Sequence, residues 1–383
     1  MSISALDEEF MRQAIALAER GRGHTHPNPI VGALIVRGGR VLATGYHRRA
    51  GQPHAEIEAL AHKGLRPKGA TLYVTLEPCC HQGRTGPCTE AILAAGIRRV
   101  VVGCCDENPL VSGRGVLALR RAGLRVDVGC LKEECRAQNR AFFRWIRGKR
   151  PWVTLKVAAT LDGFISAAPP PRDPRLRFVT GPKARAFSHH LRAQHNAILV
   201  GAGTVLADNP RLTVRATEDS PTGLLRVVLD GNLRSPPSAR LFRQFGTAPT
   251  LVIGAQPGKG RAAAARQLRE RALRRAGADV LHLPADRAGR IPIRLVLRAL
   301  AERGIQSLLV EGGSQIHAAF ISERMVDSVA FFFAPRLVGS GRRVVEGPGL
   351  DWRAPLRLGP LSASTIGKDV LLQADVIHPS GSF

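Results

Sequence analysis

The stretch that decides the fold runs from residue 54 to residue 88: it opens with His54-Ala55-Glu56 and closes with Pro78-Cys79 and Cys88. A histidine and two thiolates can bind a catalytic zinc ion, which keeps a fourth position open for the water that it activates. Glu56 lies two residues after the imidazole and therefore on a different side of a helix, where it can move protons. The stretch predicts a zinc-dependent deaminase site with His54, Cys79 and Cys88 as metal ligands and Glu56 as the proton shuttle.

The spacing of the two thiols is unusual. The general deaminase pattern places two residues between them, whereas the segment from Cys80 to Pro87 contains eight. A His-x-Glu pattern alone is weak, because it often arises by chance. Its combination with Pro78-Cys79 and Cys88 in this order makes the deaminase interpretation specific.

Length and charge limit the classes of protein to which this chain can belong. A chain of 383 residues is too long for one modest core, so we expect two domains. The formal net charge of +26 would suit a nucleic-acid binder, but the basic residues are mostly arginines spread over the whole chain. Arginine-rich codon usage accounts for the charge equally well, and binding of phosphorylated small molecules is a third possibility. We expect no nucleic-acid partner and, since no apolar run is long enough for a membrane span, no membrane partner.

Cysteine usage and the N-terminus indicate the compartment. All seven cysteines lie in the first 135 residues, and this odd, clustered set favours metal binding or reduced thiols over a disulfide framework. The acidic N-terminus lacks the basic and apolar regions of a signal peptide. Both features predict a cytoplasmic protein.

The first half alternates predicted helices and strands. Hydrophobic periodicity and turn residues predict strands at 30–36, 41–46, 71–76, 98–103 and 124–128, and helices at 5–21, 54–63, from Cys88 to about residue 97, from residue 113 to Gly123, and at 138–145. This order implies a mixed sheet covered by helices on both faces. The basic, Gly- and Pro-containing link from Arg147 to Pro151 marks a boundary, so we expect domains at 1–147 and 151–383.

The second half predicts another α/β domain, with strands at 152–158, 197–201, 226–229, 250–253, 280–283 and 307–310 and helices at 182–194, 261–275 and 292–303. The fingerprint G-x-G-x-x-G of dinucleotide-binding folds is missing, and Gly201-Ala202-Gly203 alone is weak. Glu311 ends a strand, and Gly312-Gly313 open a helix. The first N–H groups of that helix can bind a phosphate.

Several segments of the first half resemble one family. The first half is similar to the bifunctional deaminase/reductase of riboflavin biosynthesis, whose site has the same long thiol spacing. The similar segments are His24-Thr25-His26-Pro27-Asn28-Pro29, Gly45-Tyr46-His47, 51–56 and 75–88. The resemblance implies a cytidine-deaminase-like three-layer α/β/α domain that uses Zn²⁺, and it makes Asn28 a contact to the pyrimidine edge. His47 and Arg84 are either contacts to the ribose phosphate or solvated surface residues.

The resemblance continues through the second half, in Leu155-Lys156-Val157-Ala158, Leu161-Asp162-Gly163 and the segments 201–215 and 310–314. It implies a dihydrofolate-reductase-like α/β domain that binds NADPH. Lys156 and Glu311 would hold or polarise the sugar. The ribose 5-phosphate would bind to Arg192, Arg215 and the backbone of Leu212. The cofactor side would comprise Ala158, Thr204, Asp208, Gly231, Gly313, Ser314, Gln315, Ile316, His317, Ala318 and Ala319.

One loop departs from the family pattern. Leu176 stands at the substrate-binding position that is usually serine, and it cannot form a hydrogen bond through its side chain. Phe178 stands at the cofactor-binding position that is usually tryptophan; it keeps an aromatic face but loses the indole donor. The three prolines Pro169-Pro170-Pro171 precede these residues. Binding of substrate and nicotinamide in this loop is therefore the least defined part of the prediction.

We expect a cytoplasmic two-domain enzyme that forms a homo-oligomer, and the resemblance implies phosphoribosyl-pyrimidine substrates. By that resemblance, its first half would deaminate 2,5-diamino-6-(5-phosphoribosylamino)pyrimidin-4(3H)-one, and its second half would reduce the ribosyl group of 5-amino-6-(5-phosphoribosylamino)uracil to ribityl with NADPH. Two alternatives stay open. One is a deaminase whose second half has become a binding or dimerising module, and the other is an RNA nucleobase deaminase.

Overall fold

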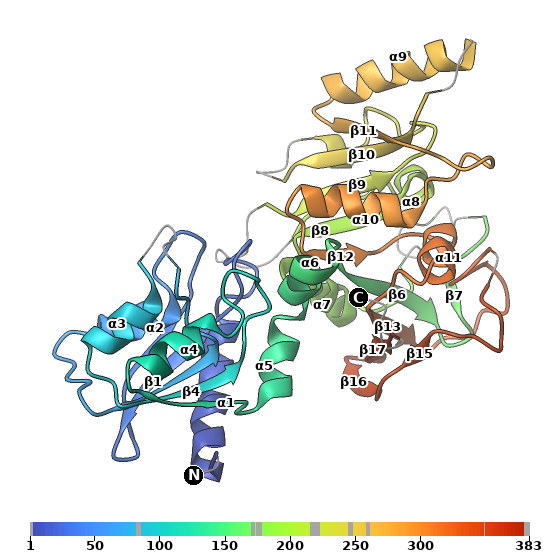
Figure 1. Ribbon diagram of the computed structural model, residues 1–383. Helices are drawn as coiled ribbons and strands as arrows, with labels where there is room; N and C mark the ends of the chain where they lie inside the picture. Colours follow the sequence, from blue (N-terminus) through green and yellow to red (C-terminus); the bar gives the residue numbers. More distant parts are fainter. Residues whose placement is uncertain are drawn as a thin grey trace. The chain divides into compact units, whose positions relative to one another are not determined.

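The computed structural model describes residues 3–81, 86–169, 173, 178–214, 223–243, 248–257, 261–347 and 349–378. The chain divides into two compact units, Met1–Gly148 and Lys149–Phe383. Figure 1 shows both units as sheets covered by helices. Among the described residues, every helix is too short or too polar to cross a lipid bilayer.

The N-terminal unit is built on a five-stranded mixed sheet. The strand order is β2 (Arg40–Tyr46), β1 (Gly32–Arg37), β3 (Thr71–Leu76), β4 (Arg99–Cys104) and β5 (Arg125–Val128). β1 runs antiparallel to β2 and β3, whereas β3, β4 and β5 are parallel. β3 and β4 are buried along nearly their whole length, because helices cover both of their faces.

Helices on both faces of this sheet complete three layers. α1 (Ala5–Glu19), α5 (Lys132–Gln138) and α6 (Arg140–Gly148) contribute to one apolar cluster with Leu34, Tyr73 and Val101. α2 (Ala55–Leu60), α3 (Cys88–Ala94) and α4 (Arg114–Arg121) contribute to a second cluster, with Ile35, Leu72 and Val100 of the opposite face. The predicted mixed sheet with two helical layers is confirmed.

The helix predicted at 138–145 is present as α6, which begins two residues later, but α5 was not predicted. The structure has two helices, α5 and α6, which meet at Asn139. The Asn139 side chain accepts a hydrogen bond from the Ile30 amide, at 2.9 Å, and donates one to the Ile30 carbonyl, at 2.9 Å. These long-range bonds hold the break between the helices, and no local pattern reveals them.

The C-terminal unit contains a ten-stranded sheet. Its main path is β11 (Asp279–Leu283), β10 (Thr250–Ala255), β9 (Leu225–Leu229), β8 (Ala197–Gly201), β12 (Ser307–Val310), β6 (Trp152–Thr160), β13 (Ser328–Ala334), β17 (Asp369–Ile377) and β15 (Arg357–Leu358), and β16 (Ser362–Ile366) also pairs with β17. All neighbours from β11 to β13 are parallel, and β17 is antiparallel. β7 (Phe164–Ser166) pairs separately with β14 (Arg342–Arg343).

Helices cover both faces of this second sheet. α10 (Ile293–Glu302) and α11 (Ser314–Ser322) pack on one face, around Leu155, Leu199 and Val310. α7 (Pro182–Ala193), α8 (Ala202–Asp208), α9 (Arg261–Arg275) and the 3-10 helix η2 (Arg240–Phe242) lie on the other. The α/β class of both halves is confirmed, although the sequence did not predict α8 or the strands after residue 327.

Candidate active sites

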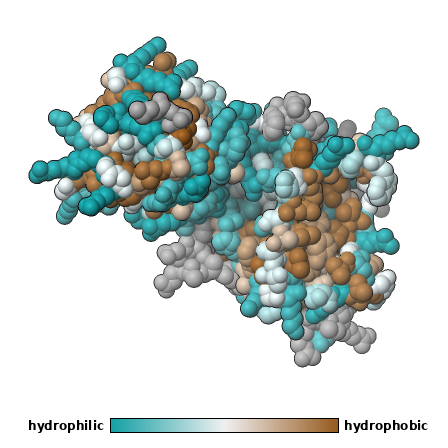
Figure 2. All heavy atoms as spheres, turned by 90° about the horizontal axis from the view of Figure 1, so that it is seen from below, coloured by the Kyte–Doolittle hydropathy of each residue, from teal (hydrophilic) through white to brown (hydrophobic). Residues whose placement is uncertain are grey.

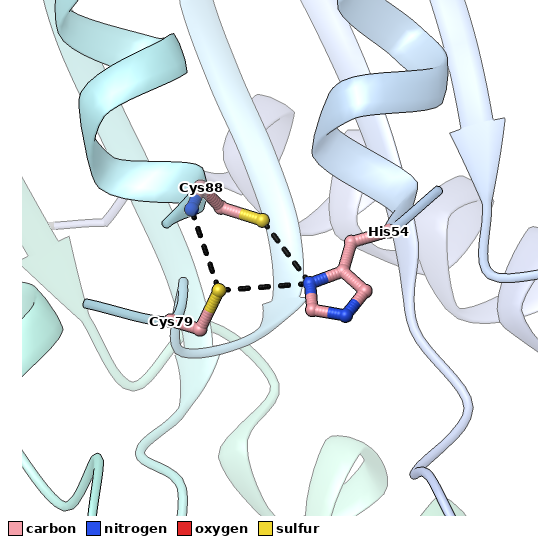
Figure 3. A group of neighbouring side chains, drawn as sticks. All are labelled: His54, Cys79 and Cys88. Atoms are coloured by element: carbon pink, nitrogen blue, oxygen red, sulfur yellow. Dashed lines mark hydrogen bonds between the residues drawn. The ribbon is translucent and has the colours of Figure 1, made fainter. Parts of the chain in front are cut away.

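The three predicted metal ligands meet in the N-terminal unit. His54 immediately precedes α2, Cys79 follows β3, and Cys88 is the first residue of α3. Figure 3 shows the three side chains converging from these elements. His54 Nδ1 lies 3.2 Å from Cys88 Sγ and 3.6 Å from Cys79 Sγ. The three ligand atoms all lie within 4.8 Å of one another.

The spacing of these atoms fits a zinc ion. In a tetrahedral site with ordinary Zn–N and Zn–S bonds, the nitrogen and a sulfur are about 3.5 Å apart, close to both observed distances. Cys79 also accepts a hydrogen bond from the Cys88 backbone N–H, at 3.3 Å. A hydrogen bond from the Cys88 thiol lowers the pKa of Cys79 to about 4, which favours the thiolate that metal binding requires. The site can hold zinc through three protein ligands.

Glu56 is buried next to the ligand set, with 3 % of its surface exposed. Burial raises the pKa of its carboxyl to about 7, while the nearby His54 acts in the opposite direction. A carboxyl that titrates near neutrality can both accept and release a proton under physiological conditions. Glu56 therefore has the place and the chemistry expected of a proton shuttle.

Asn28 and His47 form a hydrogen-bonded pair beside His54. Asn28 Nδ2 lies 3.1 Å from His47 Nε2, and His47 Nδ1 lies 3.0 Å from the Pro53 carbonyl oxygen. The His47 and His54 rings are perpendicular, with centroids 5.4 Å apart. His47 is buried and both of its ring nitrogens have partners within the unit, which disfavours the expectation that it is a solvated or phosphate-binding residue. Arg84 lies outside the described residues.

Glu77, which the sequence did not single out, holds the segment after β4 close to the zinc ligands. Its carboxylate accepts hydrogen bonds from the backbone N–H groups of Asp106, Gly113 and Val116, at 3.1, 2.9 and 3.1 Å. The Asp106 side chain accepts from the Asn108 amide, at 2.8 Å, as in a turn. The sequence contained one signal for this role of Glu77, namely its position between a predicted strand and the predicted zinc ligand Cys79.

The C-terminal unit contains a cavity of about 1510 Å³ at the carboxyl ends of its parallel strands. Gly201 ends β8, Gly231 follows β9, and Glu311 follows β12, and these three strands are neighbours in the sheet. Ligands of open α/β sheets bind in this position, outside the carboxyl ends of the strands. The topology therefore brings together segments that are far apart in the sequence.

A charged triad includes two residues of the cavity lining, Lys156 and Glu311, and a third residue behind them, Arg192. Arg192 donates to both carboxylate oxygens of Glu311, from Nε at 2.9 Å and from Nη2 at 2.7 Å, and its Nη1 donates to the Thr213 carbonyl at 3.1 Å. Burial would raise the pKa of Glu311, but Arg192 and Lys156 outweigh burial and lower it to about 2. Burial lowers the pKa of Lys156 despite the nearby Glu311. Arg192, predicted as a phosphate ligand, is engaged with Glu311 in this structure.

Most predicted cofactor residues line the same cavity: Ala158, Thr204, Asp208, Gly231 and all residues from Gly313 to Ala319. Gly313 precedes α11 without a side-chain capping bond. A Cβ atom on Gly312 would lie 2.5 Å from the Ile316 Cβ, so only glycine permits this close turn into the helix. The uncapped helix end at the cavity fits the phosphates of a dinucleotide.

Other predicted residues lie elsewhere. Leu176 and Arg215 are outside the described residues. Phe178 is 53 % exposed, is not among the cavity-lining residues, and stacks on the Arg185 guanidinium, 4.5 Å from its ring centroid. The Leu212 side chain is buried in the core, and its backbone is left-handed with φ of 52°, so only its backbone is available for a ligand.

The cavity also contains residues that sequence reasoning missed. Arg234, Arg290 and Arg294 belong to its lining and come from the loops after β9 and β11 and from the start of α10. Arginines are so frequent in this chain that no local signal distinguishes these three.

Two family models match the chain. Residues 4–104 match the cytidine and deoxycytidylate deaminase zinc-binding region, and residues 151–372 match the RibD C-terminal domain. Each match lies within one of the two units.

Curated relatives and solved structures match nearly the whole chain. Riboflavin biosynthesis protein RibD of Aquifex aeolicus (strain VF5) is 40% identical over 372 residues, which cover 97% of this chain and 98% of the relative. The RibD protein of Escherichia coli (strain K12) is 40% identical over 347 residues, covering 90% and 92%. The structure of Acinetobacter baumannii RibD, form 1, has a TM-score of 0.84 at 34% identity and covers 97% of this chain and 99% of its own. The deaminase/reductase structure from Thermotoga maritima has a TM-score of 0.80 at 36% identity, with the same coverage.

Proposed function

The chain belongs to the RibD family of bifunctional riboflavin-biosynthesis enzymes, and we propose that it performs both reactions of this family with the residues described above. The enzyme deaminates 2,5-diamino-6-(5-phosphoribosylamino)pyrimidin-4(3H)-one with zinc and then reduces the ribosyl group of the product to ribityl with NADPH. The observation that carries this proposal is the convergence of His54, Cys79 and Cys88 in one unit, together with the Lys156–Glu311–Arg192 triad at the cavity of the other. Relatives that match both units favour this function over a deaminase-only protein and over an RNA deaminase.

The residues of the deaminase site have different roles in the hydrolysis. His54, Cys79 and Cys88 would hold zinc. A zinc ion held there would lower the pKa of the attacking water. Glu56 takes a proton from the attacking water and gives it to the pyrimidine ring nitrogen; it then carries the second proton of that water to the leaving amine, which departs as ammonia. Asn28 contacts the pyrimidine edge. We assign this reaction to residues 1–147.

The reductase residues orient the sugar and the cofactor. NADPH supplies the hydride when it is bound, with its phosphates at the first turn of α11. Lys156 donates a hydrogen bond to a sugar oxygen, and its lowered pKa makes the ammonium group a better proton donor as the ring opens. Glu311 and Arg192 hold Lys156 and the sugar in place, and the Leu212 backbone and Arg215 bind the ribose phosphate. We assign this reaction to residues 151–383.

Removal of one metal ligand tests the deaminase half of the proposal. We expect the wild-type protein to contain about one zinc ion per chain, because the three candidate ligand atoms already lie within 4.8 Å of one another. Cys88→Ser should lose both the metal and ammonia release while it still oxidises NADPH with the deaminated intermediate. Elemental analysis and the two activity assays measure this.

The matched control for this variant is Cys105→Ser, which changes an exposed thiol of the same unit. It should keep zinc and both activities. A Cys88→Ser protein that keeps full zinc content and deaminates normally would rule out the proposed ligand set.

The free thiols agree with a cytoplasmic location, which is part of the proposal. All seven cysteines are unpaired, as is usual in a reducing compartment.

We also infer that the enzyme is a homo-oligomer whose copies meet through one apolar sheet face. Cross-strand pairs place Phe331 beside Leu372 and Phe333 beside Val370, on one side of β13 and β17. Val370 is 40% exposed, and the other three are only half-buried. Figure 2 shows hydrophobic atoms gathered over the C-terminal unit. A second copy of the same face is the partner with matching chemistry.

Analytical ultracentrifugation tests this interface. The wild type should sediment as a dimer or larger, and Val370→Glu should sediment as a monomer because a charge would be buried between the copies. Leu268→Glu, at a 65% exposed position on α9, is the control and should leave the assembly unchanged. A monomeric wild type would refute the inference.

A further inference from the structure

The Asn28 backbone is fixed before its side chain makes any contact. Its N–H donates to the Thr25 carbonyl at 2.8 Å, and its carbonyl accepts from the Thr25 hydroxyl at 3.0 Å. Thr25 is buried, with 3 % of its surface exposed. The remaining conformational freedom of Asn28 is the rotation of its terminal amide. That rotation decides whether the carbonyl oxygen or the NH₂ group of Asn28 faces a ligand, and the two groups have opposite hydrogen-bonding character.

His47 removes this ambiguity. Its ring nitrogen Nδ1 lies 3.0 Å from the Pro53 carbonyl oxygen, which can only accept, so Nδ1 must carry the proton. In a neutral imidazole, the other nitrogen then has a lone pair and no hydrogen. His47 Nε2 is therefore an acceptor, and the group 3.1 Å away must be the Asn28 NH₂.

His47 is itself held firmly. Its backbone N–H donates to the Val31 carbonyl at 2.9 Å, directly after β2 ends, and only 2 % of its surface is exposed. Asn28 Nδ2 is the side-chain atom that faces His47 Nε2, as a ring with its proton on Nδ1 requires. The chain of contacts from Pro53 through His47 to Asn28 thus runs from a fixed backbone carbonyl to the side chain at the deaminase site.

We propose that His47 is a positioning residue that orients the Asn28 amide, so that the deaminase site presents the Asn28 carbonyl oxygen as a hydrogen-bond acceptor to the pyrimidine edge. This rests on the proposed function, which makes Asn28 a substrate contact. A 2-amino-pyrimidin-4(3H)-one has a ring N–H next to the carbon that carries the amine, and this N–H is a matching donor. The corresponding ring nitrogen of cytosine has only a lone pair, so the same oxygen disfavours a cytosine.

A double-mutant cycle on ammonia release tests the proposal. His47→Phe keeps a ring but removes the acceptor, and it should lower kcat/KM about tenfold, mainly through KM, as expected for one lost hydrogen bond. The double variant with Asn28→Ala should be no worse than Asn28→Ala alone, within about twofold, because His47 acts only through Asn28. His47→Gln should stay within about threefold of the wild type, since its amide can donate to Pro53 and accept from Asn28.

Several measurements distinguish a positioning role of His47 from general damage to the protein. Zinc content and reduction of added intermediate should be unchanged in every variant. The ¹⁵N spectrum of wild-type protein labelled at histidine should show His47 with a protonated Nδ1 and an unprotonated Nε2, and this requires no variant. A protonated Nε2 would overturn the proposal.

The kinetic outcomes also separate this inference from the proposed function. Multiplicative losses in the double variant, or an unchanged kcat/KM in His47→Phe, would overturn the positioning role while the wild type remains an active deaminase. A wild type that binds zinc but releases no ammonia from the diaminopyrimidine would instead overturn the proposed function, and the positioning role with it.

Discussion

Glu56→Gln should abolish ammonia release and leave reduction intact. Glutamine has nearly the shape of glutamate but cannot carry a proton between water, ring and leaving amine, so the loss should reach about 10³-fold in kcat. The site around residue 56 should persist, because the three metal ligands come from other positions. Ammonia release with the diaminopyrimidine and NADPH oxidation with the deaminated intermediate measure the two activities separately.

The control for this variant is Glu90→Gln, which removes an exposed carboxylate from the first turn of α3. It should retain both activities and the bound zinc. If Glu56→Gln deaminated at the wild-type rate, the proton shuttle would have to be another group. If it lost zinc as well, its effect could not be assigned to proton transfer.

Lys156→Ala should produce the opposite phenotype. The ammonium group of Lys156 lies near Glu311 and Arg192 in the C-terminal unit, where it is the proposed donor to the sugar. Its removal takes away the charge that stabilises the opening sugar, so NADPH oxidation should fall about 10²- to 10³-fold. Ammonia release, which depends on residues of the N-terminal unit, should remain at the wild-type level.

Lys368→Ala is the matched control, because it removes an exposed ammonium group from the turn between β16 and β17. It should behave as wild type in both assays. Loss of both activities in Lys156→Ala would contradict two independent sites, and normal reduction would remove Lys156 from the mechanism.

Local patterns predicted most of the regular structure. The strands at 71–76, 197–201 and 307–310 and the helix at 261–275 have the predicted bounds, because continuous apolar runs and helical composition mark them without help from the rest of the chain. α8 was missed because Gly201-Ala202-Gly203 has low helix propensity, and packing of Val205 in the core stabilises it instead. The separation of α5 from α6 depends on the long-range bonds of Asn139 to Ile30.

The zinc ligands were predictable because their chemistry is rare. A histidine and two thiolates are a recognised ligand set for catalytic zinc, and the structure brings the three candidate ligand atoms together as expected. Arginines gave no such signal. The pairing of Arg192 with Glu311 joins residues that are 119 positions apart, and it follows only from the neighbouring positions of α7 and the end of β12.

The stretch from His54 to Cys88 by itself determined the class of the first half and predicted its metal ligands and its proton shuttle, because zinc chemistry admits few residue types and these occur in order. Only the tertiary structure decided how Asn28 is oriented, which residues share the reductase cavity, and that Lys156, Glu311 and Arg192 form one charged group. The physical reason is that hydrogen-bond direction and charge pairing depend on distances between segments, and the folded sheet sets those distances.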